Sequence, residues 1–269
     1  MVRARLLACV VAAGCGSGGG FPDAAPDSPP PGPGKITVNW TVTDTSTNQP
    51  VACSRISAAT VTATLRNRSA VGGQTQVFTC STGMGTSQGI DPGTYDIAFE
   101  LDSTQGPVLT TAPSQNGVVI EAGATTQLAP LAFAVNATGA IKLHLSTGSG
   151  TNCGAAPTNA AITTMTISMN HQSTGPCEPV TFAIGAGATK PAGSYTINCT
   201  TAAIAPCIEN DQELSAVGVP SDKYTFQIHG NVAAAACWNN TDQVTVPPLG
   251  NTLTTTLNLG HAPAGTPGC

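Results

Sequence analysis

The chain has little charge, few aromatic side chains and no long apolar run. Only 9% of its 269 residues are charged and 4% are aromatic, against roughly 25% charged residues in an ordinary globular protein. Nine basic and 14 acidic residues give a net charge of −5, which excludes the basic surface that nucleic-acid binding requires. No stretch reaches 18 apolar residues, so no helix long enough to cross a bilayer is predicted.

Sequence motifs of common enzymes and metal sites are also missing. The chain has no His-Glu-x-x-His, no P-loop and no Cys-x-x-Cys, and its only near-matches to Gly-x-Ser-x-Gly lack a strand-to-helix context,. We therefore expect a non-enzymatic protein without a metal site and without a cofactor.

Cysteine, glycine and proline are abundant instead. The chain has 10 cysteines, 30 glycines and 21 prolines. Cysteine at this density in a chain rich in threonine and glycine indicates disulfides and an oxidising compartment.

The N-terminus is typical of an exported lipoprotein. Residues 1–14 combine Arg3 and Arg5 with a short apolar run and predict a cleaved signal peptide. Ala12-Ala13-Gly14-Cys15 resembles a bacterial lipobox, in which the cysteine is lipidated, although leucine is usual where Ala12 stands. The alternative is an ordinary secretory signal with Cys15 inside it.

The following residues, 15–34, are rich in glycine and proline and predict a disordered tether,. The residues after Cys15 lack the aspartate that resembles an inner-membrane retention signal. We expect an outer-membrane lipoprotein, facing the periplasm or the cell surface, whose N-terminal lipid binds the membrane.

From Lys35 on, the sequence predicts β-structure. Ile36, Val38 and Trp40 alternate with polar residues, the period of a half-buried strand. Further short alternating segments are separated by turn signals such as Asp91-Pro92-Gly93,. The pattern favours an antiparallel sandwich with little helix.

The second half repeats the order of the first. We name residues 35–135 module 1 and residues 137–261 module 2, with a C-terminal tail at 262–269. Pro220 to Tyr224 matches Pro92 to Tyr95 in the preferred register, which gives module 2 an extra hairpin and a long loop. An alternative register matches Ala192 to Tyr195 instead.

A family resemblance rests on three segments. The chain resembles bacterial carboxypeptidase-regulatory-like, or transthyretin-like, β-sandwich modules in GKITVNWTVTDTSTNQPV, IDPGTYDIAFEL and VVIEAGATTQLAPLAF. It also looks like two-module lipoproteins of unknown role. The resemblance implies a fold of two tandem Ig-like sandwiches. The shared motifs are turns and inward aromatics, so they specify a fold and not an activity.

Few side chains are candidates for chemistry. His144 and His229 fall on the polar phase of their strands and could share a face if those strands were neighbours. Glu209 to Glu213 faintly resembles the start of a calcium loop but lacks its glycine and its distal glutamate,, and is better interpreted as solvated. Trp40 is expected in the core, and Trp238 is expected to cover a disulfide rather than stack on a sugar.

Eight cysteines remain once Cys9 is assigned to the signal and Cys15 to the lipid. Module 1 has only Cys53 and Cys80, which should form a disulfide that contributes roughly 3 kcal/mol. The repeat then predicts Cys153 with Cys199. Three pairings remain possible among Cys177, Cys207, Cys237 and Cys269, and we favour Cys207–Cys237 with Cys177–Cys269.

These expectations favour an envelope-structural or binding and adhesion role, with a glycan or an envelope protein as the ligand. The alternative is an accessory module or an enzyme that acts on envelope or extracellular polysaccharide, which would need converging carboxylates and aromatic platforms.

Overall fold

The computed structural model describes residues 32–172, 175–201 and 203–269. The expected signal peptide at 1–14, the lipidation site Cys15 and nearly all of the tether at 15–34 lie outside the described residues.

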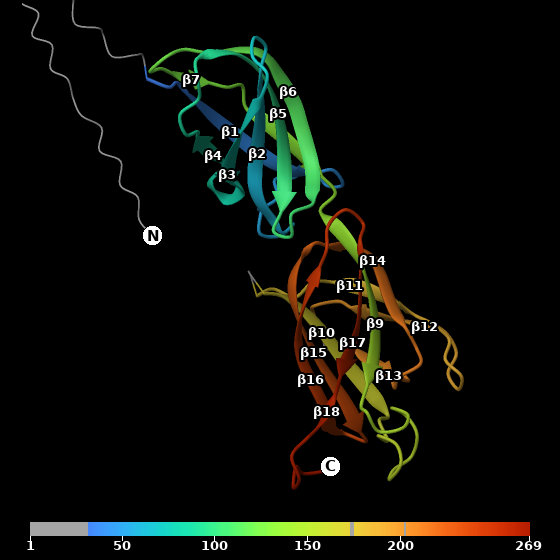
Figure 1. Cartoon of the computed structure of the whole chain (residues 1–269). Coiled ribbons are helices and arrows are strands. Elements are labelled where there is room, and N and C mark those ends of the chain that lie inside the picture. The colour runs from blue at the N-terminus through green and yellow to red at the C-terminus, as the bar shows by residue number, and fades with distance from the viewer. Residues whose placement is uncertain (1–31, 173–174, 202) are drawn as a thin grey trace, which may run out of the picture. The chain divides into compact units, whose positions relative to one another are not determined.

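Module 1 is a sandwich of two sheets (Figure 1). Its elements are β1 (Lys35–Asp44), β2 (Ala58–Asn67), β3 (Gly73–Thr79), the short 3-10 helix η1 (Cys80–Thr82), β4 (Met84–Thr86), β5 (Gly93–Ser103), β6 (Val108–Ile120), β7 (Thr125–Gln127) and β8 (Leu131–Val135). One sheet has the order β3-β2-β5-β6, and in the other β1 pairs with β4, β7 and β8.

Module 2 is also a sandwich of two sheets, and each of its sheets has five strands instead of four. Its strands are β9 (Thr138–Ser146), β10 (Thr164–His171), β11 (Val180–Ile184), β12 (Gly193–Ile197), β13 (Ile204–Pro206), β14 (Leu214–Pro220), β15 (Asp222–Val232), β16 (Ala235–Val246), β17 (Thr252–Asn258) and β18 (Gly260–His261). The sheet orders are β13-β10-β15-β16-β18 and β12-β11-β14-β9-β17.

Most strand pairs are antiparallel, as expected, but the first and last long strands of each module are parallel. β1 pairs in parallel with β7 and β8, and β9 pairs in parallel with β17, which runs beside it in Figure 1. The described residues contain no helix able to span a membrane.

Alternating side chains build a separate hydrophobic core in each module. Ile36, Val38 and Trp40 of β1 point inward, as predicted, and the Trp40 indole donates to the carbonyl oxygen of Cys80 at 2.8 Å. The core of module 1 is drawn from residues 36–137 and that of module 2 from residues 141–259. Each module therefore buries its own apolar surface.

Two tyrosines fix the register of the repeat. The Tyr95 hydroxyl donates to the carbonyl oxygen of Asp91, and the Tyr224 hydroxyl donates to that of Pro220, each at 2.7 Å and four residues back. This is the tyrosine-corner contact of Ig-like sandwiches. Tyr224 is therefore the counterpart of Tyr95, and the alternative register through Tyr195 is wrong.

All eight cysteines of the described part form disulfides, but only one predicted pair is correct. Cys53–Cys80 is confirmed. The pairs Cys153–Cys199, Cys207–Cys237 and Cys177–Cys269 are wrong, because the bonds are Cys153–Cys207, Cys177–Cys199 and Cys237–Cys269.

The corrected pairs follow the local chain path. The loop after β9 runs beside Cys207, whose N–H donates to the carbonyl oxygen of Thr163. Cys177 forms an isolated bridge with Asn170 of β10, close to the end of β12. The tail at 262–269 returns to β16, where the Ala262 N–H donates to the carbonyl oxygen of Cys237.

Asp44, the last residue of β1, binds the turn that follows it and the backbone just after β8. Its carboxylate accepts hydrogen bonds from the Ala137 N–H at 3.1 Å and from the hydroxyls of Ser46 and Thr47. Burial alone would raise the pKa of Asp44, but these hydrogen bonds outweigh it and hold the pKa well below its ordinary value,.

Candidate functional site

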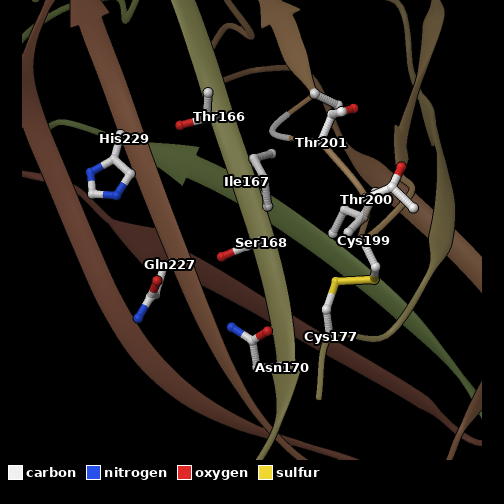
Figure 2. A pocket seen from close by; sticks show the side chains of 12 residues that line it. Thr166, Ile167, Ser168, Asn170, Cys177, Cys199, Thr200, Thr201, Gln227 and His229 are labelled. Carbon is white, nitrogen blue, oxygen red and sulfur yellow. A yellow bond between two sulfur atoms is a disulfide. The ribbon is translucent and has the colours of Figure 1, made fainter. Parts of the chain in front are cut away.

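A hollow of about 360 Å³ lies over β10 and β15 of module 2. Thr166, Ser168 and Asn170 follow one another along β10, and Gln227 and His229 stand beside them on β15 (Figure 2). Strand alternation explains the polar part of this lining, because Met165, Ile167 and Met169 are buried and leave the polar residues of β10 facing outward,. Ile167, Ile197 and Ala203 add an apolar part to the lining.

A loop cross-linked by Cys177–Cys199 forms the wall of the hollow (Figure 2). The Asn198 side-chain oxygen accepts from the N–H groups of Thr200 and Thr201 at 3.2 Å, the contact of an Asx turn. The turn and the disulfide together fix where Thr200 and Thr201 lie.

Tyr195 joins this wall to β10. Its hydroxyl lies 3.0 Å from the Ile167 nitrogen, 2.9 Å from the Ile167 oxygen and 2.9 Å from the Ala203 oxygen. Burial raises the pKa of the Tyr195 phenol above its ordinary value, although its hydrogen bond with Ile167 acts in the opposite direction. The phenol therefore stays neutral and bridges the backbone edge of β10.

A nearly buried histidine supports the same loop. His171 Nδ1 lies 2.8 Å from Asp222 Oδ2, and Nε2 lies 2.6 Å from Glu178 Oε2. The side chains are 10%, 5% and 16% exposed for His171, Asp222 and Glu178. Each ring nitrogen of His171 thus faces one carboxylate, and Arg55 Nε lies 3.6 Å from the same Asp222 oxygen.

Four polar side chains of β10 and β15, here called the polar floor of the hollow, have unused hydrogen-bond donors and acceptors. The side chains of Thr166, Ser168, Asn170 and Gln227 make no hydrogen bond to any of the described residues. Each can both donate and accept. The hollow thus presents neutral polar groups that are free to bind a ligand.

The predicted candidate residues are not brought together. His144 lies on β9 and His229 on β15, in different sheets, so the two-histidine face is wrong. His229 Nδ1 instead lies 2.6 Å from Asn239 Oδ1. In the described ranges, no three His, Cys, Asp or Glu side chains are arranged so that they could hold a metal ion.

Two carboxylates of the segment Glu209 to Glu213 accept hydrogen bonds from backbone N–H groups. Glu209 Oε2 accepts from the Cys153 N–H at 3.2 Å, and Asp211 Oδ2 accepts from the Ala188 N–H at 2.7 Å. Glu213 instead lies 3.1 Å from the Lys142 ammonium. Glu209 is buried, which corrects the expectation of a solvated loop.

Both tryptophans are buried. Trp238 is 8% exposed, and its indole donates to the carbonyl oxygen of Ala160 at 3.0 Å. It adjoins the Cys237–Cys269 disulfide and contacts the His261 ring edge-on, with ring centroids 4.8 Å apart. It is a packing residue, as expected, rather than an exposed platform.

Sequence reasoning missed the hollow. The alternation of Thr164 to Asn170 predicts an outward polar phase, but the partner strand and the Cys177–Cys199 wall depend on long-range pairing. The sequence feature that could have indicated a polar site is the set of serine, asparagine and glutamine residues, Ser168, Asn170 and Gln227, on the outward phase of their strands.

Neither a protein-family model nor a curated protein matches the sequence. Among solved structures, the chain is similar to the Bacillus anthracis TIE protein, at 10% identity and a TM-score of 0.36 over 86% of this chain. It spans about a third of that protein, 34%.

Two pilins are also similar. The minor pilin GBS52 of Streptococcus agalactiae has 8% identity and a TM-score of 0.29, covering 86% of this chain and 97% of the pilin. The major pilin of Streptococcus pyogenes has 8% identity and a TM-score of 0.31, covering 85% of this chain and 99% of the pilin.

Proposed function

We propose that this chain is a non-enzymatic binding protein of the bacterial outer membrane. In this proposal, lipid at Cys15 anchors the protein and the Gly/Pro tether at 15–34 carries two transthyretin-like sandwich modules. Four disulfides among eight cysteines support an oxidising compartment,.

The observation that carries the binding role is the open polar floor of the hollow. A ligand can bind Ser168 and Gln227 without breaking a hydrogen bond between their side chains and the described residues. The wall held by Cys177–Cys199 pre-organises the site, which lowers the entropy cost of binding.

The carboxylates near this region support binding better than hydrolysis. Glycoside hydrolysis uses a pair of carboxyl groups that face the scissile bond. Glu178 is bonded to His171, and Glu209 accepts from the Cys153 backbone. Both therefore serve structural contacts.

The anchor has a direct test. Replacing Cys15 with serine is expected to abolish partition of the protein into detergent, because the acyl chains supply the membrane affinity. Phase partition and intact mass of the wild type and of Cys15→Ser provide the measurement. A wild-type protein whose N-terminus maps beyond Cys15 and carries no acyl mass would contradict the anchor.

The hollow is tested by filling it. Ser168→Trp is expected to reduce retention of the full chain on isolated envelopes at least tenfold, because the indole occupies the polar floor and costs more than about 1.4 kcal/mol of binding free energy. Sedimentation with envelopes measures retention. Thr64→Trp is the matched control, since Thr64 and Ser168 are counterparts in the two modules.

The same assay separates binding from turnover. Release of reducing ends or peptide fragments from the envelopes, lost in Glu209→Gln or Asp211→Asn variants that remain folded, would favour the polysaccharide-acting enzyme. Equal retention of wild type and Ser168→Trp would reject the hollow as the binding site.

A further inference from the structure

The hollow belongs to a larger face that has three uncharged rows of side chains. The outward residues of β10, β15 and β16 pair in three cross-strand rows: Thr166–His229–Asn239, Ser168–Gln227–Thr241 and Asn170–Thr225–Gln243. Eight of these nine side chains are hydroxyls or amides, and the ninth is the imidazole of His229. Asp242 lies between Thr241 and Gln243 and has the opposite phase on β16. Neutral hydrogen-bonding groups therefore make up all three rows, and the neutral part of the face ends at the next row, Lys223–Thr245, where Lys223 is exposed.

Module 1 carries charge at the equivalent positions. With Tyr95 and Tyr224 as counterparts, Asp96, Glu100 and Asp102 of β5 correspond to Thr225, His229 and Asn231 of β15. These three carboxylates of β5 are thus replaced by uncharged or weakly basic groups in β15. The two faces share a backbone plan but differ in the ligand that they can accept.

The face of module 1 also satisfies its own polar groups. Thr62 donates to the Asp102 carboxylate, and Arg68 Nε donates to Asp96 at 2.9 Å. The counterpart of Thr62 is Thr166, which makes no side-chain hydrogen bond to the described residues. The hydroxyl of this strand position is therefore used within module 1 and unused among the described residues of module 2.

The chemistry of the rows selects a class of ligand. An ionic ligand would require opposite charge, which the three rows lack. The hollow combines these polar groups with an apolar part formed by Ile167, Ile197, Ala203 and the Cys177–Cys199 disulfide, the mixed lining that is usual in ligand sites. Hydroxyls and amides, which donate and accept, match the hydroxyl groups of a neutral sugar. Adjacent strands lie roughly 4.8 Å apart, a spacing close to the length of one hexose residue, so successive sugars can meet successive strands.

An extended peptide fits this site less well. Peptides that add to a sheet need a free strand edge. On β10, β13 pairs with Thr164 to Thr166, the Tyr195 hydroxyl bonds the Ile167 backbone, and the Glu178 N–H donates to the Met169 oxygen. That edge is occupied along most of the hollow.

We propose that the face formed by β10, β15 and β16 binds an uncharged glycan chain, with Ser168 and Gln227 at the centre of the contact. This inference rests on the proposed binding function and adds its ligand class.

The test is a titration of the full-length chain, purified in detergent, with defined oligosaccharides. Cellotetraose, maltotetraose and chitotetraose serve as neutral probes, with tetragalacturonate and tetra-alanine as the acidic and peptide comparators. At least one neutral probe is expected to shift the backbone amide resonances of β10 and β15 and to leave those of β2 and β5 unchanged. Ser168→Ala and Gln227→Ala are each expected to weaken that affinity about tenfold, the effect of one lost hydrogen bond worth about 1.4 kcal/mol.

Thr64→Ala in module 1 is the matched control and should leave the affinity unchanged. Tighter binding of tetragalacturonate or tetra-alanine at β10 and β15 would overturn the glycan and leave the binding function intact. The glycan would also be overturned, and the binding function kept, if no probe shifted these resonances while Ser168→Trp still lowered retention of the protein on envelopes. If no probe binds and Ser168→Trp is retained on envelopes as well as the wild type, both proposals are wrong.

Discussion

Replacing Cys153 and Cys207 with serine is expected to lower the free energy of unfolding by about 4 kcal/mol, because the bond closes a long loop in the unfolded chain. The two cysteines are separated by 54 positions. Cys207 is also buried in the core of module 2, so serine would place an unsatisfied hydroxyl there. Urea unfolding of the double variant and of the wild type measures the difference.

The matched control is Cys177→Ser with Cys199→Ser. This bond closes a shorter loop, with a separation of 22, and Cys199 is exposed. The control should lose about 3 kcal/mol. A loss for the Cys153/Cys207 variant that is no larger than the loss for the control would contradict the importance of the buried link.

Replacing His171 with alanine is expected to lower the free energy of unfolding by about 3 kcal/mol, since the nearly buried Glu178 carboxylate loses its contact with the ring, whereas Asp222 keeps Arg55 at 3.6 Å,. The substitution removes the ring between the Asp222 and Glu178 carboxylates and its contact with Tyr224, at a centroid distance of 4.7 Å. Chemical denaturation followed by circular dichroism provides the measurement.

His229→Ala is the control for a histidine on the same sheet. His229 is exposed and bonds one side chain, Asn239, so its loss should change stability by less than about 0.5 kcal/mol. Adding Glu178→Gln to His171→Ala should recover part of the lost stability by removing one of the two carboxylates. Equal stabilities of the two histidine variants would show that the His171 cluster contributes nothing.

Local sequence patterns predicted the modules well. Alternation placed Ile36, Val38 and Trp40 inward, and the Pro-Gly-Thr-Tyr turn identified the Tyr95 strand. These features depend on a few consecutive residues. The preferred register of the repeat was correct because Pro220 to Tyr224 preserves the spacing of the tyrosine corner.

The disulfides of module 2 could not be predicted in the same way. Cysteine pairing depends on where loops return, and module 2 inserts the hairpin β11–β12 before β13, which pairs with β10 as β3 pairs with β2. Cys207 follows β13 directly and is thus the counterpart of Cys80, a place that the sequence match had given to Cys199. Positional analogy therefore assigned Cys153 to Cys199, whereas the fold brings Cys153 to Cys207.

The candidate site depends on information that a single strand does not contain. The segment Thr164 to Asn170 shows which side chains face outward, but not that Gln227 and His229 lie beside them. Likewise, the sequence gives no sign that His171 joins Glu178 and Asp222, which are 7 and 51 positions away.

The parallel pairing of β1 with β8 determines how module 1 carries mechanical load. Five residue pairs, from Trp40–Leu131 to Asp44–Val135, join these strands. Parallel strands have their chain entry and exit at opposite ends, so a pull between Lys35 and Val135 slides one strand along the other. The hydrogen bonds are then loaded together in shear rather than opened one after another, which favours slow forced unfolding of a module under tension.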